Sequence, residues 1–125
     1  MDDFIEIKIA PVSKPRMTRA DAWKKRKCVL EYCAYKDHLN YLAKLAKFKL
    51  GNGFYVKFYL PMPKTWSNAK KQEMAGKWHQ AKPDWDNLAK ALQDCLLDND
   101  SSVCKAIVEK YWDYEGKILI KNIEV

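Results

Sequence analysis

The sequence predicts an α/β fold of the α+β kind, a small mixed β-sheet of about four strands with helices packed on it. Two segments, residues 4–10 and 54–60, alternate apolar and polar side chains in the manner of strands with one buried face. Between them, residues 20–47 contain no proline or glycine and carry a helical apolar pattern. The predicted order of elements is β-α-β-α-α-β-β, within a single domain over residues 1–125.

The first strand is indicated by isoleucine at every second position, Ile5, Ile7 and Ile9, with charged residues between them. Residues 11–16 follow with two prolines, so this segment is expected to be irregular. Thr18 is the expected N-cap of the helix that comes next. Apolar residues spaced by seven and four form one stripe along that helix: Trp23, Leu30, Ala34, Tyr41 and Leu45.

The middle of the chain contains the clearest predicted strand, over residues 54–60. Four apolar side chains share one of its faces: Phe54, Val56, Phe58 and Leu60. Two prolines, Pro61 and Pro63, end the strand. A short helix is then expected over residues 67–75, because Gly76 stops it.

The C-terminal part is predicted to contain one helix and two strands. Apolar residues recur three and four apart over residues 86–97, which indicates a helix with a buried face. Residues 103–113 and 117–125 are predicted as strands. Since only a short turn at Glu115 and Gly116 separates them, the simplest arrangement is a hairpin.

The composition limits the functions that this chain can have. It has 23 lysines and arginines against 16 aspartates and glutamates, a formal net charge of +7, so the simplest partner is a nucleic acid. No two of the four cysteines have Cys-x-x-Cys spacing, which favours reduced thiols over a zinc site. No apolar run approaches the roughly 20 residues of a membrane span. The N-terminus lacks a signal-peptide pattern, so a soluble cytoplasmic protein is expected.

The most informative segment has two carboxylates one residue apart, Asp84 and Asp86, just before the last predicted helix. Lys90 follows Asp86 by four residues and so shares its helix face. A third acid, Asp100, precedes the next strand. Carboxylate oxygens are ligands that Mg²⁺ prefers, and substrate phosphate completes its coordination shell. An acid cluster on a basic chain therefore indicates metal-assisted chemistry on a polyanion, provided that the chain brings Asp100 back toward Asp84.

These residues also have ordinary structural explanations. Asp86 is a natural N-cap for the helix. Lys90 could form a surface ion pair with Asp86 or Asp94, worth about 0.3–0.5 kcal/mol, and Asp94 is expected to be a structural partner of Lys90. A helix cap accounts neither for a second acid at Asp84 nor for Asp100.

Two runs of basic residues bracket the acid segment. The first consists of Lys14, Arg16, Arg19, Lys24, Lys25, Arg26 and Lys27. The second consists of Lys64, Lys70, Lys71, Lys77 and Lys82. Either run alone is consistent with a solvated face, but together they favour contact with a phosphate backbone. Four side chains nearby either stack on unpaired bases or pack in the interior: Trp66, Trp78, Trp85 and His79.

The block Lys82-Pro-Asp-Trp-Asp-Asn-Leu-Ala-Lys-Ala-Leu-Gln-Asp94 resembles a pattern of the RusA-type Holliday junction resolvases of phages and prophages. Those proteins carry K-P-D-x-D-N-L-x-K-x-x-x-D, followed by an acidic loop and a strand. The segments Pro11–Arg16 and Pro61–Ser67, with the lysine-rich helix after them, also resemble members of this family. The similarity covers most of the chain.

The resemblance implies a homodimer of small mixed α/β subunits that resolves four-way DNA junctions by paired symmetric cuts. It implies that Asp84, Asp86 and Asp100 bind Mg²⁺, with Mn²⁺ as the alternative ion, and that Lys90 is the catalytic lysine. Contact with DNA is expected from four basic residues: Lys14, Arg16, Arg19 and Lys82.

Two departures from the family pattern lie in the late acidic loop. Asn99 precedes Asp100, where the family often has a second acid, and Ser102 stands where a glutamine is common. The late ligand is therefore either Asp100 or Asp98. Two other functions stay open at this point: a non-enzymatic DNA-binding module whose acids are caps and ion pairs, and a metal-dependent nuclease for another branched DNA.

Overall fold

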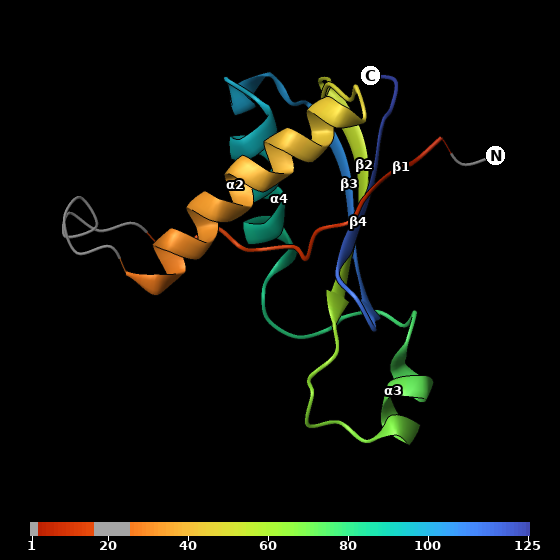
Figure 1. The fold of residues 1–125 in the computed structure, drawn as a ribbon. Helices are drawn as coiled ribbons and strands as arrows, with labels where there is room; N and C mark the ends of the chain where they lie inside the picture. Colours follow the sequence, from red (N-terminus) through yellow and green to blue (C-terminus); the bar gives the residue numbers. More distant parts are fainter. Residues whose placement is uncertain (1–2, 17–25) are drawn as a thin grey trace.

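The computed structural model describes residues 3–16 and 26–125. It contains one four-stranded sheet in the order β1-β4-β2-β3 (Figure 1). The strands are β1 (Ile5–Ile7), β2 (Gly53–Pro61), β3 (Lys105–Asp113) and β4 (Lys117–Asn122). β4 pairs antiparallel with both β1 and β2, whereas β2 and β3 are parallel. The predicted mixed sheet and α+β class are thus confirmed.

The predicted hairpin between the last two strands is wrong, because β2 lies between β3 and β4. Residues 114–116 instead carry the chain across the end of β2, where Met62 N donates a hydrogen bond of 3.0 Å to Asp113 O. The physical reason is the apolar content of β2. Its inward side chains are fully buried, and a strand with hydrogen-bonding partners on both edges buries them best.

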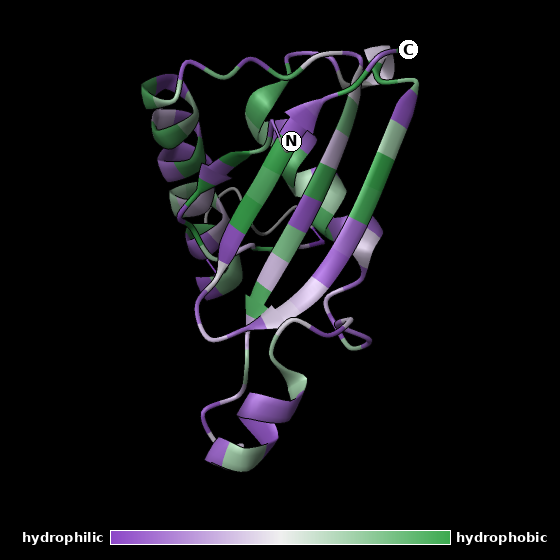
Figure 2. Cartoon of the chain, turned by 90° about the vertical axis from the view of Figure 1, so that its right-hand side faces the viewer, coloured by the Kyte–Doolittle hydropathy of each residue, from purple (hydrophilic) through white to green (hydrophobic). Residues whose placement is uncertain are grey.

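Two helices, α2 (Lys27–Leu45) and α4 (Trp85–Leu96), cover one face of the sheet (Figure 1). The core between these layers is built from fully buried side chains of both: Phe54, Phe58, Ile118, Ile120, Leu39, Leu88 and Leu92. Figure 2 shows the opposite face of the sheet, over which no helix of the described chain lies. The buried face of α4 agrees with the predicted spacing of apolar residues.

The described part of the predicted apolar stripe lies on the exposed side of α2. Trp23, the first residue of that stripe, and Thr18, the expected N-cap, lie outside the described residues. Tyr41 and Leu45 are 59% and 62% exposed, and Leu30 and Ala34 are exposed as well. The helix buries a different set: Tyr32, Tyr35, Leu39 and Ala43. These residues are spaced by three and four, so α2 has apolar side chains on two sides, and the stripe faces outward.

The short helix α3 (Asn68–Met74) extends beyond the end of the sheet (Figure 1), and none of its residues is buried. Ser67 caps it by accepting a hydrogen bond of 3.2 Å from Lys70 N. After α3 the chain returns along the outer edge of β3, where Gly76 N donates to Trp112 O at 2.8 Å and His79 N donates to Lys110 O at 3.0 Å. This pairing leads the chain along β3 to the acid segment.

All four cysteines are free thiols. Cys95 is buried, and its burial raises the pKa of the thiol to about 12, which makes it unreactive. The other three cysteines, Cys28, Cys33 and Cys104, are exposed. Among the helices of the described residues, none has the length and apolar character needed to cross a membrane.

Candidate active site

The two carboxylates of the acid segment lie at the first turn of α4. Asp84 is the N-cap, and its carbonyl oxygen accepts the first helical hydrogen bond, 3.2 Å from Leu88 N. The expectation that Asp86 caps the helix is wrong, because the N-cap is Asp84, two residues earlier, and Asp86 lies within the first turn. The carboxylate of Asp84 makes no capping hydrogen bond. Both side chains are exposed, and the helix dipole stabilises their negative charge.

The irregular segment after β1 lies against this end of α4. Lys14 N donates a hydrogen bond of 3.4 Å to Asn87 O. One hollow of about 410 Å³ is lined by Ser13, Lys82, Pro83, Asp84 and Asn87. A second, of about 440 Å³, is lined by Lys14, Pro15, Arg16, Asn87 and Lys90. Because Asn87 lines both, the two hollows adjoin.

The fold therefore brings five of the predicted site residues to one end of α4, although they come from distant parts of the sequence: Lys14, Arg16, Lys82, Asp84 and Lys90. Asp86 shares the first turn of the helix with them. Of the predicted DNA contacts, Arg19 lies outside the described residues. The arrangement combines carboxylates with cations around a concave surface, which suits a phosphate ester bound with a metal ion.

Asp94 pairs with a different lysine from the one expected. Its Oδ2 lies 2.7 Å from Lys14 Nζ and accepts a hydrogen bond of 3.3 Å from the Tyr32 hydroxyl. Asp94 thus ties the segment after β1 to α4 and α2, and its ion pair is with Lys14 in place of the expected Lys90. Lys14 therefore has a structural contact in addition to the DNA contact predicted for it.

Lys110 is a site residue that the sequence analysis missed. It lies on β3 with its side chain toward the helices, opposite Phe58 in the parallel pairing. Its Nζ donates hydrogen bonds of 2.7 Å to the carbonyl oxygens of Ala81 and Pro83. Burial lowers the pKa of Lys110, and the nearby charge of Asp84 opposes this. The sequence does contain a signal for this role: Lys110 alternates with Val108 and Trp112 on the inward side of a predicted strand, where a charged residue needs a partner.

Asp100 lies at the other end of α4. Its backbone begins a short 3-10 helix (Asp100–Ser102) beyond the C-terminus of α4, near the start of β3 (Figure 1). The 12 residues of α4 span about 18 Å. In one chain the backbone of Asp100 is therefore not brought to Asp84, and its side chain lies outside the described part. The described side chains include no cluster of three or more metal-binding residues.

The structure separates the four aromatic and imidazole candidates into two pairs. His79 is buried, with its ring centroid 4.0 Å from that of Trp112, and Trp66 packs on Trp112 at 4.8 Å. Trp78 and Trp85 are 56% and 58% exposed. Packing thus explains the first pair, whereas the second pair is accessible to a ligand.

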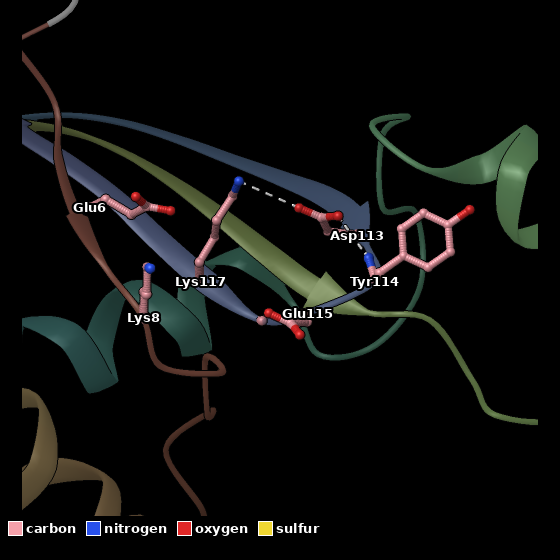
Figure 3. Close-up of a pocket in the computed structure, with 7 residues that line it drawn as sticks. Glu6, Lys8, Asp113, Tyr114, Glu115 and Lys117 are labelled. Atoms are coloured by element: carbon pink, nitrogen blue, oxygen red, sulfur yellow. Dashed lines mark hydrogen bonds and ion pairs between the residues drawn. The ribbon is translucent and has the colours of Figure 1, made fainter.

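A separate hollow of about 410 Å³ lies at the turn between β3 and β4 (Figure 3). Lys117 forms an ion pair of 3.6 Å with Asp113 there, and Asp113 Oδ1 accepts a hydrogen bond of 2.7 Å from Tyr114 N. Glu6 and Lys8 of the N-terminal segment complete its wall, as Figure 3 shows. This hollow contains none of the predicted site residues.

Comparison with known families agrees with the resemblance that the acid segment indicates. The profile of the family described as Endodeoxyribonuclease RusA matches residues 6–122. The chain belongs to the RusA endodeoxyribonuclease family. Membership supports an endodeoxyribonuclease that acts on Holliday junctions in DNA recombination. A search of curated proteins finds no match.

Proposed function

We propose that this RusA-family protein is a Mg²⁺-dependent endodeoxyribonuclease that resolves four-way junctions by paired, symmetric cuts. The observation that carries the proposal is the N-terminus of α4. There the carboxylate of Asp84 makes no capping hydrogen bond, and Asp86 lies in the same turn. The hollows beside them are lined by Lys82, Lys90 and Arg16. A helix cap alone does not require this combination of acids and cations.

The donor set fits a hard divalent cation. Asp84 and Asp86 supply carboxylate oxygens, which suit Mg²⁺, and Mn²⁺ accepts the same ligands. When bound, the ion would neutralise charge on the phosphate and lower the pKa of a water molecule. Asp98 and Asp100 are the candidates for a third ligand, and we assign that role to Asp100 on the basis of its position in the family pattern.

The cations of the site have separate tasks in this proposal. Lys90 lines the hollow beside Asn87 and stabilises negative charge on the phosphate oxygens while the phosphodiester bond is hydrolysed. Arg16 and Lys82, on the two sides of Asn87, hold neighbouring phosphates of the bound strand. Lys110 is a positioning residue for the acid segment, because it fixes the carbonyl groups that precede Asp84.

We further propose that the active form is a homodimer in which Asp100 of one copy completes the site of the other. The position of Asp100 beyond the far end of α4 supports this, since one chain holds its backbone away from Asp84. A two-fold dimer also supplies two equivalent sites, as two symmetric cuts require. The exposed apolar stripe of α2 (Leu30, Ala34, Tyr41 and Leu45) is the surface that we assign to this contact.

The test is a cleavage assay with a labelled synthetic four-way junction and a matched linear duplex, each with Mg²⁺ or with chelator. We expect paired nicks in the junction only, lost with chelator and in Asp86→Asn. Glu73→Gln, which changes an exposed carboxylate on α3, is the control and should cleave normally. Cleavage that persists in Asp86→Asn contradicts the assigned site. Binding without cuts indicates a DNA-binding module, and preferred cutting of flaps or forks indicates a different branched substrate.

A further inference from the structure

A cavity of about 350 Å³ opens on the outer edge of β3, next to the acid segment. Trp78 and Trp85 both line it, Val108 contributes an apolar surface, and Gln80 and Lys110 add polar groups. Cavities of this size and mixed character accept small organic groups. The cavity is separate from the two hollows around Asn87, because it shares no lining residue with them.

The two indoles are presented in a way that suits stacking. Trp78 stacks on Tyr111 with ring centroids 4.8 Å apart and an interplanar angle of 20°. Tyr111 in turn stacks on Tyr59 at 5.1 Å and 20°. These contacts fix the plane of Trp78, yet the indole stays more than half exposed. A preoriented, accessible aromatic surface costs little conformational entropy when it binds a second ring.

Trp85 connects the cavity to the proposed chemistry. It is the first residue of α4 and lies in the sequence between Asp84 and Asp86. Lys110, which also lines the cavity, donates a hydrogen bond to the carbonyl oxygen of Pro83, the residue before Asp84. A group inside this cavity is therefore a near neighbour of whatever the acid segment binds.

The charge around the cavity narrows the choice of occupant. Lys77 lies in the segment that leads to it, and Lys82 and Lys110 follow on the side of the acid segment. Glu109 is the acidic residue in the lining of this cavity. Its Oε1 already accepts hydrogen bonds of 2.7 and 2.8 Å from the Tyr55 and Tyr111 hydroxyls. A flat ring that carries a phosphate beside it matches both the indoles and the lysines.

We propose that this cavity receives one unpaired nucleobase of the DNA strand bound at the acid site, stacked on the indoles of Trp78 and Trp85. The inference rests on the proposed function in one respect, that DNA binds at the acid segment. Bases at a branch point are less costly to unstack than those in a continuous duplex, so such a cavity favours branched DNA. Selection of branched DNA is thereby assigned to residues outside the acid cluster.

The test measures binding of a labelled four-way junction by fluorescence anisotropy in chelator, so that no cleavage occurs. Trp78→Ala and Trp85→Ala should each weaken junction binding by about 5- to 150-fold, the range for losing one base–aromatic stack. Phenylalanine at either position should restore most of the affinity, because it keeps a stacking surface. Tyr114→Ala removes an aromatic of similar exposure (55%) away from this cavity and should bind normally.

The deciding experiment repeats these measurements on junctions with one abasic residue, scanned through the nucleotides next to the branch point. At the nucleotide that enters the cavity, the abasic junction should bind the alanine variants and the wild type equally. Equal losses on junction and linear duplex, no position with this coupling, or dissociation of a dimer in the tryptophan variants would each overturn the inference. If one abasic position abolishes the effect of the tryptophan variants but the wild type never cuts the junction, the base-binding cavity is upheld and the nuclease proposal is rejected. If the wild type cuts the junction but no abasic position has this effect, the nuclease proposal is upheld and the cavity is rejected.

Discussion

Lys110 Nζ donates a 2.7 Å hydrogen bond to the carbonyl oxygen of Pro83, the residue immediately before Asp84. A second bond of the same length goes to Ala81 O. One ammonium group on an edge strand therefore holds the loop that enters α4, and with it the backbone from which Asp84 projects. Hydrogen bonds that involve a charged donor are stronger than neutral ones, typically about 1.5–3 kcal/mol, so this contact is suited to fixing a site.

The first prediction concerns this anchor. Lys110→Met keeps the apolar stem but leaves both carbonyl groups without their donor, so the loop should lose its fixed position. We expect cleavage to fall by about 10- to 100-fold, as for other residues that orient metal ligands, and to require more Mg²⁺. Lys105→Met, which changes the first residue of β3, is the control. Normal Mg²⁺ dependence in Lys110→Met would show that the anchor has no part in the site.

The anchor also shows which parts of the structure sequence reasoning can reach. The helix after Asp84 was predicted because its apolar period is local and strong, and its N-terminus placed Asp84 and Asp86 together. The role of Lys110 depends on the register of β3 against β2, which no local pattern encodes. The hairpin failed for the same reason: strand order depends on which strand buries most surface, and here this is β2.

The outward stripe of α2 illustrates a different limit. Spacing alone shows that apolar residues share one side of a helix, but α2 has two such sides. Tyr32 and Leu39 are buried, whereas Tyr41 and Leu45 face outward. The spacing of apolar residues does not show which of two apolar faces is buried, because both faces satisfy the helical repeat. Which side is buried depends on the shape of the surface against which the helix packs.

The second prediction is a metal-dependent shift in melting temperature. A ligand at about a hundred times its Kd stabilises the folded state by about 2.7 kcal/mol, which corresponds to several degrees in Tm. Mg²⁺ should raise the Tm of the wild type and of the control Glu73→Gln, and should leave the Tm of Asp84→Asn unchanged. An equal shift in Asp84→Asn would place the metal elsewhere.

The third prediction is a pH dependence from His79. Burial lowers the pKa of this imidazole, and the charge of Lys110 adds to the effect. The unfolded chain, with a pKa of about 6.5, then binds more protons than the folded one, so stability should fall as pH drops below about 6.5. Denaturant unfolding between neutral and mildly acidic pH measures this. The slope should shrink in His79→Gln and persist in His38→Gln, which changes an exposed histidine on α2.

The fourth prediction concerns the exposed stripe of α2. Tyr41→Glu and Leu45→Glu introduce charge into the proposed contact between two copies while leaving the buried side of the helix intact. Sedimentation should show a dimer for the wild type and mostly monomer for the variants, with cleavage lost. Lys44→Glu, a neighbouring exposed position outside the stripe, should remain dimeric. Stable dimers of both stripe variants would assign the contact to another surface.

The fifth prediction tests whether a site contains residues of two copies. Asp86→Asn and Asp100→Asn should each abolish cleavage when assayed alone. If Asp100 acts on the partner's site, a heterodimer of the two variants has one site with both defects and one site with none. Mixing the inactive proteins under conditions that exchange subunits should then restore nicking of one strand of the junction.

If all three acids act within one chain, each site of that heterodimer carries a defect and the mixture stays inactive. The far end of α4, where Asp100 begins its short 3-10 helix, favours the first result. Replacing Asp100→Asn by Asp98→Asn in the same mixture identifies the late ligand. Asp98→Asn should cleave on its own if Asp100 is the ligand, whereas loss of activity in Asp98→Asn alone, with Asp100→Asn active, would reverse that assignment.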